Sequence, residues 1–338
     1  MHFVSIICPV FNEEKFIDKC VESIIQQDYP KEFMEVFFVD GMSIDSTRSK
    51  IEKYSQKYSY LKLLENKNKI VPCALNIGIE NAKGDVIIRI DGHCVYPLNY
   101  ISVLVTNLFE LNADNVGGVW NTLPANNTTK SKAIAIASSH KFGVGDSKHK
   151  VGVSKTVETD TVPFGCYRRE VFDKIGFFDE ELIRNQDDEF NARLIKNGGK
   201  IFLIPGLVIN YTARDSVKKM SKMYYQYGLF KPLVNKKLGA PATIRQFFPV
   251  TFLLGLILGA LLSIYSNFFL IPYATVLFLY LFLATLFAFR SANQNKNYKL
   301  IAVLPAVFFV IHISYGYGYL VGIYKIVMHQ KFNVEINR

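Results

Sequence analysis

Asp91 and His93 stand on either side of one glycine, directly after Val86–Ile90, an apolar run rich in β-branched residues. Such a run is typical of a buried strand, and open α/β sheets bind their ligands beyond the carboxyl ends of their strands. An aspartate and a histidine at that place are suitable ligands for a divalent cation that neutralises a diphosphate. The alternative is a turn that caps a core strand.

A second group of charged side chains, Asp187, Asp188 and Glu189, follows Asn185 at the start of a segment that ends before Gly198. Acidic residues in the first turn of a helix are stabilised by the positive end of the helix dipole, which alone accounts for their position. A chemical role for these carboxylates needs support from the rest of the chain.

The elements that must position these residues alternate between strand and helix, which predicts an α/β fold with a parallel sheet and helices on its faces. The apolar spacing predicts strands at 3–8, 36–39, 61–64, 86–90 and 116–120, a strand from 162, and strands at 200–204 and 207–211. It predicts helices at 13–27, 43–58, 72–82, 99–111, 131–139, 169–175 and 185–196. A mobile loop, either a lid or a disordered stretch, is expected after residue 139.

The composition describes two different parts of one chain. Its 338 residues suffice for about two units at ~150 residues per domain. The mean hydropathy is +0.15, and the apolar excess lies near the C-terminus. The net charge of +10, much of it beside apolar segments, favours an anionic lipid surface over nucleic acid as the partner.

The cysteines indicate a reducing compartment. They are odd in number and widely spaced, which disfavours a disulfide framework or a zinc site. The apolar run at residues 3–8 is too short for a signal peptide and has no basic segment before it. The five cysteines are Cys8, Cys20, Cys73, Cys94 and Cys166.

Three runs at about 247–266, 268–289 and 300–324 are each long enough to cross ~30 Å of hydrocarbon. Before them, residues 214–246 mix lysines with Met and Tyr, which predicts a basic amphipathic helix in the membrane interface. An ordinary amphipathic surface helix is the alternative for that segment.

The positive-inside rule orients these segments. Basic residues flank the first two runs at 231–245 and 290–299, so these runs form a hairpin with the N-terminal domain in the cytoplasm. The third run either crosses or re-enters. Crossing would place Lys325, Lys331 and Arg338 outside, against the positive-inside rule. Residues 325–338 are expected to form a tail.

Seven motifs then occur in a fixed order, at Val4–Glu14, Val39–Thr47, Ala74–Asp85, Arg89–His93, Phe164–Phe172, Gly176–Glu180 and Asn185–Phe190. Together they resemble family 2 glycosyltransferases of the GT-A fold, and in particular membrane-associated enzymes of bacterial exopolysaccharide assembly of the succinoglycan (ExoA-like) type. The resemblance covers about residues 2–232. It implies a GT-A domain over 1–213, built on a Rossmann-like, mostly parallel sheet, followed by the transmembrane region at 247–324.

The resemblance also implies a site for a nucleotide-diphosphate sugar, by default a UDP-sugar. The two residues Asp91 and His93 fall on the family's D-x-D motif, which holds a divalent metal, so Mn²⁺ or Mg²⁺ is the expected cofactor. Histidine in place of the second acid is a softer ligand, which favours Mn²⁺. The implied donor-binding residues are Pro9, Asn12, Glu13, Asp40, Asn76, Arg89 and Asp91.

The catalytic base implied by the resemblance is Asp187. The family's motif reads E-D-x-E, and the sequence here is Gln186-Asp-Asp-Glu189, so an acidic neighbour is lost on one side. Asp188 is the alternative base. Glu189 is expected to assist in binding the acceptor.

The acceptor side is implied at Gly165 and Gln226. Gly165 would let the acceptor ring approach the backbone. Gln226 begins the sequence Gln226-Tyr-Gly-Leu-Phe-Lys231, at the place of a Q-x-x-R-W motif whose Arg and Trp are absent here. A single-addition enzyme is therefore expected rather than a processive synthase.

We accordingly expect an inverting glycosyltransferase that acts on a lipid-linked saccharide in surface or exopolysaccharide biosynthesis. It would be a multi-pass protein of the cytoplasmic membrane with its catalytic domain in the cytoplasm. One alternative is a polyprenol-phosphate glycosyltransferase, whose acceptor is the lipid phosphate itself. Another is a non-catalytic membrane sensor of nucleotide sugars.

Overall fold

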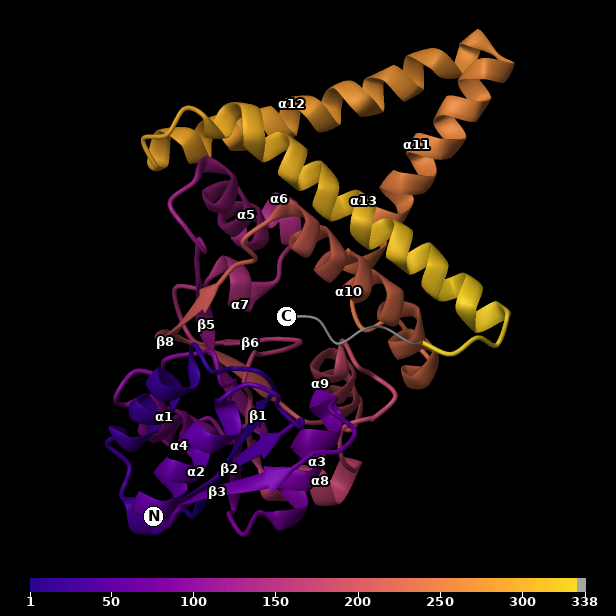
Figure 1. Ribbon diagram of the computed structural model, residues 1–338. Coiled ribbons are helices and arrows are strands. Elements are labelled where there is room, and N and C mark those ends of the chain that lie inside the picture. The colour runs from indigo at the N-terminus through magenta and orange to yellow at the C-terminus, as the bar shows by residue number, and fades with distance from the viewer. Residues whose placement is uncertain (333–338) are drawn as a thin grey trace. The chain divides into compact units, whose positions relative to one another are not determined.

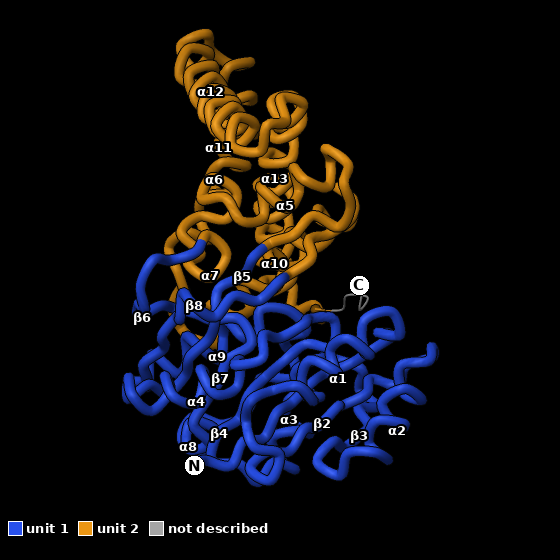
Figure 2. Tube along the Cα trace, turned by 90° about the vertical axis from the view of Figure 1, so that its left-hand side faces the viewer, with its two compact units in different colours: residues 1–121, 152–210, 335–338 blue, residues 122–151, 211–334 orange. Residues whose placement is uncertain are grey.

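The computed structural model describes residues 1–332 (Figure 1). Contacts within the chain divide it into two units, each built from separate stretches of sequence (Figure 2). Of the described residues, the first unit holds Met1–Asn121 and Gly152–Asn210, and the second holds Thr122–Val151 and residues 211–332. The segment Thr122–Val151, which we expected inside a domain at 1–213, therefore packs with the C-terminal helices.

The centre of the α/β fold is one sheet of eight strands. They are β1 (Val4–Val10), β2 (Met34–Asp40), β3 (Leu61–Glu65), β4 (Val86–Arg89), β5 (Asn115–Leu123), β6 (Val157–Glu158), β7 (Cys166–Arg168) and β8 (Ile201–Thr212). Their order is β3-β2-β1-β4-β7-β5-β8-β6. The first four in that order are parallel, whereas β7 runs antiparallel to β4 and β5. The α/β fold is confirmed, with the parallel pairing in its N-terminal half.

Residues 201–212 form one strand, where we expected two strands separated at Pro205-Gly206. The short strand β6 pairs with β8 only at Phe202 and Leu203. Pro205 lies beyond the stretch that β6 covers, at the kind of edge position where strands tolerate proline. The strand therefore continues through it.

Helices pack on both faces of the sheet, because successive side chains of each strand point to opposite sides. Ile6, Phe38 and Ile88 enter one core cluster, which also receives α1 and α4. The adjacent residues Ile7, Phe37 and Ile87 enter a second cluster, with α3, α8 and α9. The helices of this unit are α1 (Ile17–Ile25), α2 (Thr47–Lys57), α3 (Val71–Asn81), α4 (Tyr100–Glu110), α8 (Arg169–Ile175) and α9 (Gln186–Lys196).

The second unit is helical. Its helices are α5 (Thr129–Ser139), α6 (Lys141–Val144), α7 (Lys148–Val151), α10 (Val217–Leu238), α11 (Phe247–Tyr265), α12 (Leu270–Gln294) and α13 (Leu300–Val327). The expected loop after residue 139 thus contains α6 and α7, the first of them capped by the His140 side chain. Of the expected tail, Lys325–Val327 belongs to α13, and residues 333–338 lie outside the described part.

Three helical segments of the second unit are long and apolar enough to cross a membrane. They are Ile244–Tyr265, Asn267–Gln294 and Leu300–Val327. These segments match the three apolar runs of the sequence.

Candidate functional site

Three adjacent parallel strands bring the candidate residues to one edge of the sheet. Val10 of β1 pairs with Asp40 of β2, and Ile7 of β1 pairs with Arg89 of β4. The loops that follow these strands therefore emerge side by side, at the carboxyl ends where α/β sheets bind ligands. Pro9, an expected donor residue, is buried within β1 itself.

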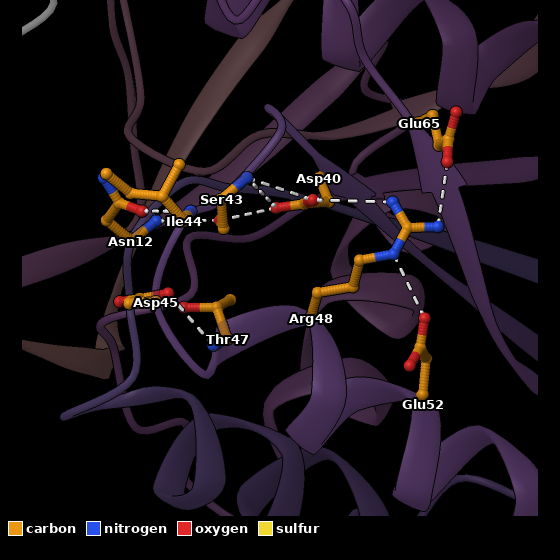
Figure 3. Close-up of polar contacts among 9 residues, drawn as sticks. All are labelled: Asn12, Asp40, Ser43, Ile44, Asp45, Thr47, Arg48, Glu52 and Glu65. Atoms are coloured by element: carbon orange, nitrogen blue, oxygen red, sulfur yellow. Dashed lines mark hydrogen bonds and ion pairs between the residues drawn. The ribbon is translucent and has the colours of Figure 1, made fainter.

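Asp40 is fully buried and organises the loop that follows β2 (Figure 3). Its carboxylate accepts hydrogen bonds from the Ser43 hydroxyl, at 2.5 Å, and from the Ser43 backbone N–H, at 3.2 Å. Arg48 approaches it to 3.9 Å and also contacts Glu52 and Glu65. The loop is therefore held in a defined conformation around a carboxylate.

Asn12 ties the loop after β1 to this same loop (Figure 3). The side-chain oxygen of Asn12 accepts a hydrogen bond from the Ile44 backbone N–H at 3.0 Å. The backbone N–H of Asn12 donates to the Ser43 hydroxyl at 2.9 Å. Asn12 has a φ of 55°, a left-handed conformation that asparagine tolerates better than most residues. The expected nucleotide residues Asn12 and Asp40 thus belong to one connected structure.

His93 faces Glu13 rather than a cluster of acids. Its Nδ1 lies 3.5 Å from the Glu13 carboxylate, which is buried. The backbone of Asp91 is held by Tyr96, whose hydroxyl oxygen accepts from the Asp91 N–H at 2.8 Å. No sequence pattern indicates this role of Tyr96, because a tyrosine five residues from an aspartate is not a recognisable motif.

Within residues 1–332, no three His, Cys, Asp or Glu side chains form a ready-made metal cage. Asp91 and His93 nevertheless fit a cation that arrives with a substrate, because Mg²⁺ is typically held by one or two carboxylates together with phosphate oxygens. The Asp91 side chain is 20% exposed, so a ligand can reach it. The donor set therefore suits a metal shared with a diphosphate.

Arg89 joins the two acidic parts of the site. Its guanidinium forms an ion pair with Asp187 on α9 and a second one with Asp91, at 3.3 Å. Although burial alone would lower it, the two carboxylates hold the pKa of Arg89 above its ordinary value. Arg89 is thus paired with an acid 98 positions away in the sequence.

Asp187 is the second residue of α9, after Asn185 with its left-handed φ of 61°. Burial raises the pKa of the Asp187 carboxyl above its ordinary value, against the opposing charge of Arg89. The charges of Asp91 and Asp188 act in the same direction as burial. A carboxylate with a raised pKa is better suited to accept a proton at neutral pH.

Glu189 is engaged elsewhere. Its two carboxylate oxygens accept from Arg193 at 2.7 and 3.0 Å, one turn further along α9. Arg193 in turn binds the backbone carbonyls of Ile175 and Phe177. In this structure Glu189 therefore anchors α9, and its contact with an acceptor stays a prediction.

Three further expected site residues are buried. Asn76 binds the backbone of Phe178 in both directions and donates to Glu180 at 2.9 Å. A Cβ at Gly165 would lie 2.5 Å from the Tyr167 hydroxyl. The close contact with Tyr167 therefore favours glycine at this position, and the approach of an acceptor ring stays a prediction. Gln226 is buried in α10 of the second unit.

Comparison with known proteins identifies related sequences. The family model described as glycosyl transferase family 2 matches residues 5–176. A curated relative from Methanococcus voltae, named dolichyl N-acetyl-α-D-glucosaminyl phosphate 3-β-D-2,3-diacetamido-2,3-dideoxy-β-D-glucuronosyltransferase, is 31% identical over 96% of this chain and 98% of its own. The succinoglycan biosynthesis protein ExoA of Rhizobium meliloti is 28% identical over 93% of both chains.

A solved structure shares the fold. The mannosyltransferase PcManGT from Pyrobaculum calidifontis, in complex with GDP-mannose and Mn²⁺, superimposes with a TM-score of 0.58 at 18% identity. The match covers 93% of this chain and 87% of that one. At this identity the likeness concerns the fold alone.

Proposed function

The chain belongs to glycosyl transferase family 2, and we propose that it is an inverting enzyme that transfers a sugar from a nucleotide-diphosphate donor to a lipid-linked saccharide. The observation that carries the proposal is the pair of contacts that Arg89 makes with Asp91 and Asp187. They bring the acid of the D-x-H motif and the acid at the start of α9 to one place. A donor diphosphate and an attacking acceptor must meet at such a place.

On the donor side, Asn12, Glu13 and Asp40 are proposed to bind the nucleobase and ribose. Carboxylate and amide oxygens accept hydrogen bonds from uracil N–H groups and ribose hydroxyls, which supports this role. Asp91 and His93 are proposed to hold Mn²⁺ or Mg²⁺. The cation, when bound, neutralises charge on the departing diphosphate.

On the acceptor side, Asp187 is proposed as the catalytic base. It would take the proton of the acceptor hydroxyl while that oxygen attacks the anomeric carbon from the face opposite the diphosphate, so the configuration inverts. Its raised pKa supports this role, because a base must hold the proton that it receives. Asp188 remains the alternative base.

The names of the relatives support a lipid-linked saccharide as the acceptor. That of the M. voltae enzyme describes a sugar already attached to dolichyl phosphate, and that of the R. meliloti protein refers to succinoglycan biosynthesis. A bare polyprenol phosphate is the less supported acceptor. The three long apolar helices support a place in the cytoplasmic membrane, with the catalytic domain in the cytoplasm.

The test is a screen of UDP- and GDP-sugars with the full-length protein and extracted membrane lipids, in which release of nucleoside diphosphate is measured. We expect release with one donor, its loss in EDTA and its return with Mn²⁺ or Mg²⁺. Mass spectrometry of the lipid product should give an extended lipid-linked saccharide. If the product is a glycosyl monophospholipid, the enzyme is a polyprenol-phosphate glycosyltransferase. No release with any donor would contradict the proposal.

A further inference from the structure

The third apolar helix, α13, is covered differently from α11 and α12. In its most apolar stretch 39% of the residues are buried inside the structure, against 6% and 11% for the other two. It is also one uninterrupted helix, so it lacks the break at which a re-entrant segment would turn back. The segments that cover α13 therefore decide where it lies.

The middle of α13 is covered by the short helix α6. The Nε2 atom of His312 lies 2.8 Å from the backbone carbonyl oxygen of Phe142. The ring of Phe142 also stands edge-on to Phe308, with 5.1 Å between the centroids. The residue next to Phe142 is the exposed Lys141. The charged residue Lys141 therefore lies close to the middle of α13.

The second half of α13 packs against α10, and the two helices run in the same direction. The hydroxyl oxygens of Ser221 and Ser314 lie 2.8 Å apart. One turn further along both helices, a Cβ at Gly318 would lie 2.1 Å from the Tyr225 carbonyl oxygen. The backbones therefore meet directly, and the exposed Lys222 follows Ser221.

These contacts oppose a transmembrane position for α13. A hydrocarbon core of ~30 Å takes ~20 residues of helix, and any such stretch of the 28-residue α13 includes residues 308–319. Lys141 and Lys222 would then lie at the depth of the lipid tails, where charged side chains are strongly disfavoured. Crossing would also place Lys325 and Lys331 outside, against the positive-inside rule.

The exposed residues of α13 form a stripe that suits a lipid surface instead. At the ~100° of rotation per residue of an α-helix, their positions fall within about a third of the helix circumference, which places them on one face. Tyrosine is enriched where a membrane meets water, and the stripe contains two tyrosines. Its residues are Ala302, Ala306, Phe309, Tyr317, Ile323, Tyr324 and Val327.

We infer that α13 lies along the cytoplasmic surface of the membrane, with this apolar stripe on anionic phospholipid and its buried side against α10 and α6. Only α11 and α12 cross, as a hairpin. The inference rests on the membrane attachment in the proposed function and fixes its topology. The residues that directly follow α13 stay on the same side as the catalytic domain.

Single cysteines can test this, because the native cysteines of the chain are buried free thiols. The variants Asn267→Cys, Asn295→Cys and Gln330→Cys mark the hairpin turn, the α12–α13 loop and the residues after α13. Each is treated with a membrane-impermeant maleimide in intact cells and in inverted vesicles, with the unsubstituted chain as the background.

We expect the cysteine at 267 to react only from outside the cell, and those at 295 and 330 only in inverted vesicles. Reaction at 330 from outside, with 267 also outside, would mean that α13 crosses, and would overturn this inference alone. Failure of 267 to react from outside would mean that the hairpin does not cross. That result would overturn the membrane attachment and this inference together.

A second experiment tests the pairing of α10 with α13 in membranes. In the double variant Ser221→Cys/Ser314→Cys, mild oxidation should form an intramolecular disulfide, seen as a change in gel mobility that a reductant reverses. The two single variants are the controls. No disulfide under conditions that oxidise an exposed cysteine pair would show that α13 has left α10, and the inference would fail.

Discussion

At the scale of single residues, the role of Asp187 as the base predicts a large loss of kcat when the residue is changed. Loss of a general base lowers the rate typically ~10²–10⁴-fold, whereas loss of an acid that only stabilises a helix start costs ~0.3–1 kcal/mol of stability. Asp187→Asn keeps the size of the side chain and should lower kcat by ~10²–10⁴-fold, with donor affinity largely preserved.

Asp188→Asn is the matched control, one position further along the same helix. It should keep most of the wild-type kcat. If Asp187→Asn instead keeps more than about a tenth of the activity, Asp187 is not the base. An inactive Asp188→Asn in the same experiment would move the role to its neighbour.

The charge of Arg89 should be visible in the dependence of kcat on pH. Burial raises the pKa of Asp187, and Arg89 opposes that rise. The base works only when ionised, so the rate should fall as the pH drops through this raised pKa, above the ~3.9 of a free aspartate. Arg89→Met should move this acid limb to higher pH, and Arg89→Lys should move it less. Identical acid limbs in both variants and the wild type would contradict the role of the ion pair.

Side-chain pairing is what the sequence predicts least well. The motifs identified Asp91 and Asp187, but no local signal indicates that Arg89 pairs with Asp187, 98 positions away. The sequence likewise does not indicate that the polar atoms of Asn76 and Glu189 bind a turn and a neighbouring arginine. Such contacts depend on tertiary structure, which residue types and spacing do not specify.

At the scale of elements, the glycines between α10 and α13 predict a stability effect. A Cβ at Gly318 would lie 2.1 Å from a backbone oxygen of α10, so Gly318→Val must push the helices apart. Overpacking of this kind costs typically ~1–3 kcal/mol. The thermal midpoint of the protein in detergent should fall.

Gly255→Val on α11 is the control, because a Cβ there meets nothing within 4 Å. It introduces the same β-branched residue into a helix of the same unit. Equal losses of thermal stability in the two variants would mean that helix propensity, and not the contact between α10 and α13, sets the effect.

The elements that the sequence predicted are those with a long apolar period. Helices such as α3 and α4, and strands such as β1 and β2, lie where apolar spacing indicated them. The two-residue strand β6 and the four-residue helices α6 and α7 were missed, because so few residues show no period. Three uncharged runs predicted three long helices, but their different burial depends on contacts with other segments.

At the scale of the whole molecule, the chain combines a sheet edge that gathers acids with three helices long and apolar enough to cross a membrane. A soluble nucleotide sugar and a lipid-borne acceptor would both reach such an enzyme at the cytoplasmic face. The acidic residues predict how the new bond is formed: one base and one displacement invert the anomeric centre, whereas a retaining reaction would need a different arrangement.

The anomeric configuration of the product therefore distinguishes a single displacement, which inverts, from a reaction that retains. The full-length enzyme is incubated with its donor and lipid-linked acceptor, and the anomeric coupling of the newly attached sugar is measured by NMR beside that of the donor. We expect a lipid-linked saccharide in which the new linkage has the anomeric configuration opposite to that of the donor. A product that keeps the configuration of the donor would contradict a single displacement assisted by Asp187.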